Sequence, residues 1–261
     1  GVLTSLADLS ASALIKDRLA ALHQAVETVA APPLWNVATL GGNIRQNTRC
    51  LYYNQSRAWR LERPACFKAG GDCCHAVPKG KKCFSVYCGD LAPALLALGS
   101  RVAVKSKNQA RVIPLQDLFT GNGLNPFSLA ADELITGVII PLPGARDGSS
   151  YEKMRLRPAV DYPLLAAAAS VTLRGDQTIE KARLILGAVG PTPVEVETDR
   201  LFPDGTFEQI PADAFREILG QRAPLVDNLA LPGSYRRKML PVIAGKAIQG
   251  ALRSIRNKEQ L

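Results

Sequence analysis

The chain has 261 residues, 47% of them hydrophobic, and a formal net charge of +9. This length is enough for a buried core in one large or two modest domains. It argues against a small secreted disulfide scaffold, and no apolar run approaches the roughly 20 residues that span a bilayer.

The positive charge is concentrated in two segments. Residues 45–82 contain nine basic and two acidic residues, a net charge of +7, and the chain from Arg236 onward carries +6. Basic patches of this kind suit nucleic acid, acidic proteins or a bound anionic centre. The first residues, Gly1–Thr4, have neither an initiator Met nor a secretory signal pattern, so the chain is expected to start partway through a fold.

Hydrophobic spacing predicts the elements of the first half. Apolar residues at three- to five-residue steps predict a helix over 12–29, which Pro32 and Pro33 end. A short apolar segment then leads into a glycine turn at 39–43. Beyond a long loop, the expected elements are a helix over 91–98, strands over 101–105, 111–115 and 133–141, and a helical turn over 115–119.

In the second half, residues 141–150 contain two prolines and two glycines and are the best linker candidate. Three strands are expected to follow, with Gly175-Asp176 as a hairpin turn between the last two. Strands followed by helices predict the α+β class. The expected strands are 151–157, 166–173 and 178–189, and the expected helices are 211–219 and 234–255.

Residues 45–87 have no hydrophobic period and are interrupted by prolines and glycines, which predicts a long loop. A loop of this length inside a compact domain is uncommon unless something orders it. All six cysteines fall within a span of 39 residues, from Cys50 to Cys88, which favours a metal or cluster site in a reducing compartment. They are Cys50, Cys66, Cys73, Cys74, Cys83 and Cys88.

One ligand set, Cys50-x15-Cys66-x7-Cys74-x8-Cys83, spans the loop. Such loose spacing suits an iron–sulfur cluster, whereas zinc sites usually show Cys-x2-Cys pairs, which this chain lacks. The surrounding positive charge would stabilise an anionic cluster and raise its reduction potential. Spacing alone leaves three alternatives: an iron–sulfur cluster, a structural zinc site, and cysteines without a metal.

The glycine turn Thr39-Leu40-Gly41-Gly42-Asn43 is a candidate anion site. Glycines let the backbone approach an anion, successive N–H groups can form an anion-binding nest, and the Thr and Asn side chains add donors. The alternative is an ordinary tight turn. The fingerprint G-x-G-x-x-G is absent, which argues against a Rossmann dehydrogenase.

Several motifs resemble the FAD-binding subunits of molybdenum hydroxylases, the group that includes xanthine and carbon monoxide dehydrogenases. In the first half they are ATLGGNI at 38–44, GDLAPAL at 89–95 and DELIT at 132–136. In the second half YEKMRLR at 151–157, DYPL at 161–164 and GSYRRKM at 233–239 resemble that family's C-terminal domain.

The resemblance covers nearly the whole chain and implies two domains. The first is an FAD-binding domain over 1–142, whose N-terminal subdomain, with a second glycine-rich pyrophosphate loop, should precede Gly1. The second is an α+β domain over 150–258, with a three-stranded antiparallel sheet and helices.

Some forty residues separate the glycine turn from Gly89-Asp90, where most members of the family have only a few. An inserted cysteine loop, here about 45–88, is similar to that of the β subunits of 4-hydroxybenzoyl-CoA reductases, which carry a [4Fe–4S] cluster there. The resemblance implies Cys50, Cys66, Cys74 and Cys83 as the ligands.

The resemblance also implies roles around FAD. Residues Thr39, Leu40, Gly41, Gly42 and Asn43 would contact the pyrophosphate and ribityl region through backbone N–H groups. Asp90 would accept hydrogen bonds from FAD hydroxyls, or alternatively cap the next helix. Lys153 would place positive charge near the flavin ring, or be a solvated strand lysine. Leu134 would line the flavin pocket, or be plain core.

The implied function is electron relay. An acidic ferredoxin, steered by the basic loop, would supply electrons through the cluster and FAD. They would reach the [2Fe–2S] centres of a small subunit and the molybdenum cofactor of a large subunit, where an aryl-CoA thioester loses its ring hydroxyl. A cytoplasmic protein without a nucleic-acid or membrane partner is expected.

Two alternatives to this function stay open. One is a flavin subunit of a xanthine-, aldehyde- or CO-dehydrogenase-like hydroxylase that passes electrons outward. The other is a zinc-stabilised nucleic-acid-binding module, which the few aromatic residues among the basic ones argue against.

Overall fold

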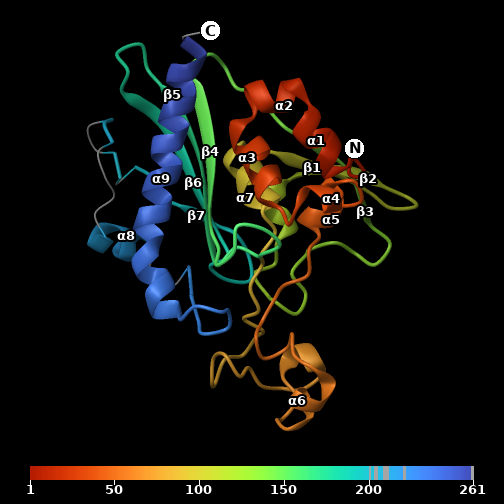
Figure 1. Ribbon diagram of the computed structural model, residues 1–261. Helices are drawn as coiled ribbons and strands as arrows, with labels where there is room; N and C mark the ends of the chain where they lie inside the picture. The colour runs from red at the N-terminus through yellow and green to blue at the C-terminus, as the bar shows by residue number, and fades with distance from the viewer. Residues whose placement is uncertain (200, 203–204, 208–211, 220–221, 260–261) are drawn as a thin grey trace.

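The computed structural model describes residues 1–199, 201–202, 205–207, 212–219 and 222–259. They form two antiparallel sheets with helices packed against them, which confirms the α+β class (Figure 1). Within these residues no helix has the length and apolar character to cross a membrane.

Short helices make up most of the N-terminal region. The helix expected over 12–29 is divided in two, because Leu19 has a non-helical backbone conformation (φ −124°, ψ 57°). The helix expected over 91–98 is confirmed as α7. The helices are α1 (Leu6–Ala11), α2 (Ala13–Arg18), α3 (Ala20–Thr28), α4 (Pro32–Trp35), α5 (Leu40–Ile44) and α7 (Leu91–Ala97).

The first sheet has three strands in the order β2-β1-β3, and they are the three strands expected from the sequence, within two residues at each end. Strand β1 alternates strictly, with Val102 and Val104 buried against the helices and the intervening side chains more exposed. The strands are β1 (Arg101–Lys105), β2 (Ala110–Pro114) and β3 (Leu134–Ile139), and the 3₁₀ turn η2 (Leu115–Leu118) follows β2.

The second sheet has the order β4-β5-β6-β7, every neighbouring pair being antiparallel. Its first three strands are those expected from the sequence, and a short fourth strand extends it. Strand β4 begins inside the segment expected to be a linker. The strands are β4 (Asp147–Met154), β5 (Leu165–Leu173), β6 (Ile179–Gly187) and β7 (Val194–Val196).

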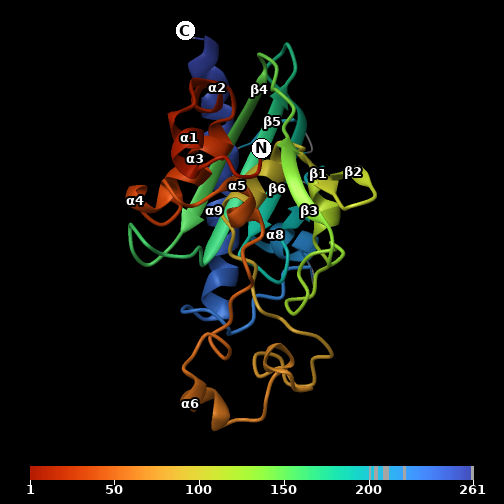
Figure 2. The ribbon, with the colours of Figure 1, turned by 90° about the vertical axis from the view of Figure 1, so that its right-hand side faces the viewer.

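The second sheet is the shared wall of two hydrophobic cores. Helix α9 (Gly233–Glu259) covers one face, and α3 and α7 cover the other (Figures 1 and 2). Because both faces are covered, β5 is apolar on both sides, with four consecutive alanines. Helix α8 (Ala212–Leu219) lies near α9, and Pro211, its expected first residue, lies outside the described residues.

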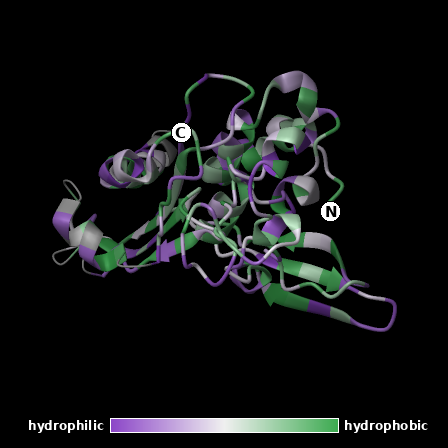
Figure 3. Ribbon diagram, turned by 90° about the horizontal axis from the view of Figure 1, so that it is seen from below, coloured by the Kyte–Doolittle hydropathy of each residue, from purple (hydrophilic) through white to green (hydrophobic). Residues whose placement is uncertain are grey.

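The cysteine-rich segment leaves this body as a long projection, seen at the bottom of Figures 1 and 2. It contains two short helical turns, α6 (Arg57–Leu61) and η1 (Phe67–Ala69). Figure 3 shows hydrophobic residues gathered on the sheets, and more hydrophilic colour on connecting segments. The loop expected over 45–87 is confirmed in outline.

Candidate functional site

The glycine turn forms the start of helix α5. Thr39 is its N-cap, with Oγ1 accepting from the Gly42 N–H at 3.1 Å. The Asn43 N–H donates to the Thr39 carbonyl at 3.0 Å. The remaining two N–H groups, of Leu40 and Gly41, donate to the carbonyls of Thr4 and Val2 at 3.0 and 2.8 Å. The four backbone N–H groups of residues 40–43 therefore all have protein acceptors.

The two glycines are explained by close packing. A Cβ on Gly41 would lie 2.8 Å from the Val2 Cβ, and one on Gly42 would lie 3.0 Å from the Thr39 Oγ1. The turn thus has a structural role in this conformation: it receives the N-terminal segment and caps α5. A contact between these N–H groups and FAD remains a proposal, and it requires Val2 and Thr4 to withdraw.

Asn43 connects the glycine turn to the segment after the cysteine loop. Its Oδ1 accepts a hydrogen bond from the Leu91 N–H, the first of α7, at 3.0 Å. Asp90 occupies the N-cap position of α7, as the helix-cap alternative expects, but its side chain makes no capping hydrogen bond. Sequence patterns miss this cap because its two residues are 48 positions apart.

Asp90, Tyr151 and Lys153 form a buried polar group. Asp90 Oδ1 accepts from the Tyr151 hydroxyl at 2.7 Å and lies 3.0 Å from Lys153 Nζ. Lys153 also donates to the Thr28 carbonyl at 2.9 Å. The side chains of Asp90 and Lys153 are only 5% and 1% exposed, so the solvated-lysine alternative is wrong.

Burial and charge act in opposite directions on this ion pair. Burial raises the pKa of Asp90 above its usual value, and the nearby Lys153 ammonium opposes that rise. Burial likewise lowers the pKa of Lys153, and the Asp90 carboxylate opposes it. Each charge is therefore stabilised mainly by the other.

Leu134 lies elsewhere, at the start of the outer strand β3. Its side chain is 71% exposed, so the plain-core alternative is wrong. The link from β3 to the glycine turn runs through Val2, whose N–H donates to the Thr136 carbonyl at 3.4 Å while its carbonyl accepts from Gly41. The structure therefore unites Asn43, Asp90 and Lys153, and leaves Leu134 on the surface.

The four cysteines expected as ligands line one cavity in the projecting loop, together with Cys73. Cys88 lies apart, fully buried, with its thiol 3.6 Å from the Val86 carbonyl oxygen. The cavity measures about 20 Å³, which is room for a water molecule. The thiol donors fit an iron–sulfur cluster in kind, but their side chains must move apart to admit one.

No three His, Cys, Asp or Glu side chains in the described part of the chain meet closely enough to hold a metal ion. In a [4Fe–4S] cluster each thiolate binds a different iron, so its sulfurs lie farther apart than the ligands of one ion. A metal ion or cluster at these residues therefore remains a proposal.

Lys68 holds the walls of this cavity together. Its ammonium donates to the Thr48 carbonyl at 2.6 Å and to Asn47 Oδ1 at 2.9 Å, and it lies 3.4 Å from Ser85 Oγ. Burial lowers the pKa of Lys68, while Cys83, Cys50 and Cys66 act to raise it. Burial raises the pKa of Cys50 to about 11. The spacing of the cysteines in the sequence did not predict that Lys68 would lie beside this cavity.

Residues from the second half of the chain anchor the root of the loop. The Leu51 N–H donates to the Asn228 carbonyl at 2.9 Å, and Asn228 Nδ2 donates to the Phe84 carbonyl at 2.7 Å. The Arg49 guanidinium lies 4.1 Å from the centre of the Tyr162 ring. The segments beside Cys50 and Cys83 are thus tied to the second half, through residues that sequence patterns did not reveal.

Two family models together match most of the chain. Residues 1–143 match the FAD binding domain in molybdopterin dehydrogenase, and residues 149–251 match the CO dehydrogenase flavoprotein C-terminal domain.

Individual relatives agree with these models. The aldehyde oxidoreductase FAD-binding subunit PaoB of Escherichia coli is 30% identical over 94% of this chain and 76% of its own length. The carbon monoxide dehydrogenase medium chain of Afipia carboxidovorans is 30% identical over 65% of this chain, but this spans only 58% of that relative.

Solved structures share the fold. Reconstituted CO dehydrogenase from Oligotropha carboxidovorans aligns with a TM-score of 0.68 at 19% identity, over 97% of this chain and 74% of that chain. Quinoline 2-oxidoreductase from Pseudomonas putida 86 aligns with a TM-score of 0.65 at 17% identity, over 98% and 74%. By the family models and by PaoB, this chain belongs to the FAD-binding subunits of the molybdenum hydroxylase family of oxidoreductases.

Proposed function

We propose that the chain holds FAD and relays electrons in a complex with a molybdenum-containing large subunit and an iron–sulfur small subunit. The complex would be a xanthine-, aldehyde- or CO-dehydrogenase-like hydroxylase, as the names of the relatives suggest. The observation that carries the proposal is the buried ion pair of Asp90 and Lys153, which follows the helix cap made by the glycine turn.

In this proposal the FAD-binding domain extends over 1–142 and the C-terminal domain over 150–258. The flavin would accept one or two electrons. Lys153 would provide positive charge beside it, and the carboxylate of Asp90 would orient that lysine and accept hydrogen bonds. The remaining contacts would come from Thr39, Leu40, Gly41, Gly42, Asn43 and Leu134.

A purified complex tests the flavin assignment. Lys153→Met should lower the FAD content severalfold, because the ammonium is buried and is the largest counter-charge of the buried Asp90 carboxylate. Lys107→Met, which removes a charge from an exposed turn, should leave the content unchanged. Equal FAD content in both variants would refute the role of Lys153.

The cysteine loop favours a more specific function. We propose a [4Fe–4S] cluster on Cys50, Cys66, Cys74 and Cys83, as in a 4-hydroxybenzoyl-CoA reductase-like complex that receives electrons from an acidic ferredoxin. The supporting observations are the shared cavity, the adjacent Lys68 and the net charge of +7 over 45–82. The free thiols favour a reducing compartment such as the cytoplasm.

Iron, acid-labile sulfide and zinc assays on anaerobically purified protein test the cluster. Cys66→Ala should abolish the iron–sulfur EPR signal, whereas Cys73→Ala should leave it. Zinc without iron would refute the cluster. Substrate choice needs a separate test: 4-hydroxybenzoyl-CoA should reoxidise the reduced complex if the reductase alternative holds, and fail to do so if the chain serves a hydroxylase.

A further inference from the structure

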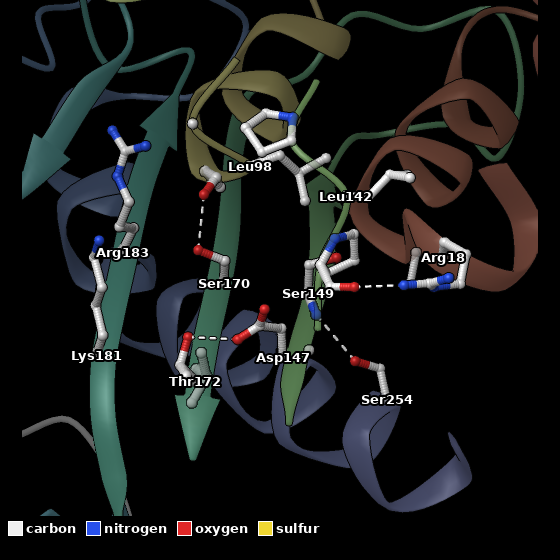
Figure 4. Close-up of a pocket in the computed structure, with 17 residues that line it drawn as sticks. Arg18, Leu98, Leu142, Asp147, Ser149, Ser170, Thr172, Lys181, Arg183 and Ser254 are labelled. Carbon is white, nitrogen blue, oxygen red and sulfur yellow. Dashed lines mark hydrogen bonds between the residues drawn. The ribbon is translucent and has the colours of Figure 1, made fainter. Parts of the chain in front are cut away.

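A second cavity, of about 270 Å³, opens on the second sheet at the end of β4 opposite to Lys153 (Figure 4). Two neighbouring cross-strand rows of polar residues form its floor. The next row on the same face, Tyr151, Ala168 and Ile185, belongs to the hydrophobic core. The two polar rows are Asp147, Thr172 and Lys181, then Ser149, Ser170 and Arg183.

This change from apolar to polar coincides with the end of the covering helices. The last residue of α7 with the two residues after it (97–99) and the segment 141–143 form the rim, and Ser254 of α9 closes one side. Figure 4 shows Arg18 reaching in from α2, across from Lys181 and Arg183 on β6. The floor is therefore polar where no helix covers it, and cations approach it from two sides.

The cationic side chains keep N–H groups that make no hydrogen bond to the described part of the chain. The Lys181 side chain forms no hydrogen bond or ion pair with the residues that the structure describes, and it is exposed. Arg183 uses Nε and Nη2 for Glu195, at 2.8 and 3.2 Å, and directs Nη1 toward the rim, where a Cβ on Gly99 would lie 3.3 Å away. Arg18 donates through Nη2 to the Pro143 carbonyl.

The acceptors in the cavity are already occupied. The oxygens of Asp147 accept from the Thr172 hydroxyl at 2.7 Å and from the Gly144 N–H at 2.6 Å. The Ser170 hydroxyl donates to the Ala97 carbonyl at the end of α7, at 2.7 Å. The lining has three cations and one carboxylate, and the Glu195 carboxylate paired with Arg183 lowers the net charge around the cavity to +1.

We propose that this cavity binds a phosphate group, either free inorganic phosphate or that of a small phosphorylated molecule. Guanidinium and ammonium groups are the side chains that recognise phosphate oxygens. A volume of about 270 Å³ lies just below that of common small-ligand pockets, which suits a ligand of a few heavy atoms beyond the phosphate. The proposal is independent of the flavin and of the cysteine loop.

Isothermal titration of the purified protein, in phosphate-free buffer at constant ionic strength, tests it with inorganic phosphate, glycerol 3-phosphate and chloride. Saturable binding of the phosphate-containing probes is expected. Lys181→Met and Arg18→Met should each weaken it about tenfold, or 1.4 kcal/mol. Lys105→Met, an equal loss of charge on the exposed face of the first sheet, should change nothing.

The relative affinities identify the ligand. Tighter binding of glycerol 3-phosphate indicates a phosphate ester, and equal binding of the two probes indicates free phosphate. The proposal is overturned if neither probe saturates by about 10 mM, if chloride competes equally, or if Lys105→Met weakens binding as much as Lys181→Met. Circular dichroism of each variant separates lost binding from lost folding.

Discussion

At the scale of single residues, the ion pair of Asp90 and Lys153 shows how a polar group comes to lie inside an α+β core. Strand β4 places Tyr151 and Lys153 on the face toward α3 and α7, and Asp90 immediately precedes α7. Removing one partner of such a pair usually costs more than replacing both, because the remaining charge stays buried.

The ion pair predicts a dependence of stability on pH. The pKa of Asp90 is raised above its usual 3.8 in the folded protein, so the native state holds this proton more tightly than the unfolded chain. Its contribution to the unfolding free energy is therefore largest below pH 3.8 and decreases as the pH rises through the folded pKa.

Comparison of wild type with Asp90→Asn by urea unfolding, at a series of pH values from 4 upward, measures this contribution. The difference in unfolding free energy should move in favour of Asp90→Asn as the pH rises, and Lys153→Met should steepen the dependence. A difference that is constant with pH would contradict the raised pKa.

Lys68 supports a second prediction at this scale. Lys68→Met removes the ammonium that ties Thr48, Asn47 and Ser85 around the cysteine cavity. Loss of a residue that holds metal ligands in position typically lowers metal affinity 10- to 100-fold. If the proposed cluster binds in this cavity, the iron retained after dialysis against a chelator should therefore fall about tenfold. Lys81→Met, an exposed residue of the same loop, serves as control, and equal retention in both variants would contradict the role.

At the scale of elements, the projecting loop depends on a residue from the far end of the chain. Asn228 is fully buried and bonds to both arms of the loop root: its backbone carbonyl accepts from the Leu51 N–H, and its side-chain amide donates to the Phe84 carbonyl. Since its side chain replaces water as the partner of a buried carbonyl, the anchor should stabilise the loop by about 1–3 kcal/mol.

Asn228→Ala should therefore speed proteolysis within the loop while leaving the rest of the chain intact. Limited digestion followed by mass spectrometry locates the cuts. Asn36→Ala, at an exposed helix end outside the loop, is the control. Cleavage at the same rate in both variants would show that the loop is held by other contacts.

Arg236 plays a comparable part for helix α9. Its guanidinium is fully buried and donates to the carbonyls of Leu231, Ala188 and Val226 at 3.1, 3.3 and 2.6 Å. Arg236→Met removes the side-chain donor from the Leu231 and Ala188 carbonyls and one of the two donors to the Val226 carbonyl, which also accepts from the Asn228 N–H. The loss should cost about 3 kcal/mol of unfolding free energy. Chemical denaturation measures the loss, and the exposed Lys238→Met should stay within about 0.5 kcal/mol of wild type.

At the scale of the whole molecule, a concentration of positive charge lies in a loop outside the body that holds the hydrophobic cores. Two cores share the second sheet, and the cysteine loop projects from the body with a net charge of +7 over 45–82. Such a field steers an anionic partner toward the loop and is screened beyond about 10 Å at 0.1 M salt.

If an acidic ferredoxin docks on this loop, the rate of electron transfer to the complex should fall steeply with added salt. Stopped-flow measurements between about 0.02 and 0.5 M salt would show this. Replacing Arg57 and Lys79 by Gln should lower the low-salt rate and flatten the dependence. A rate that does not depend on salt would contradict steering.

The sequence by itself determined the local elements of this protein. Alternation and apolar spacing located β1, β3, β5 and α7 to within a few residues, because these patterns depend only on which face of an element is buried. Motif resemblance supplied the family, which the matches over both halves bear out. The break at Leu19 and the short strand β7 were missed, since neither carries a strong local signal.

Tertiary structure alone decided how distant residues meet. Asn43 caps a helix 48 residues away, and Lys68 joins chain segments on either side of the cysteine cavity. Asn228 anchors a loop more than 140 residues upstream. Two backbone N–H groups of the glycine turn donate to the backbone carbonyls of Thr4 and Val2. These contacts depend on packing between elements, where a buried polar group takes whichever partner the fold brings within reach.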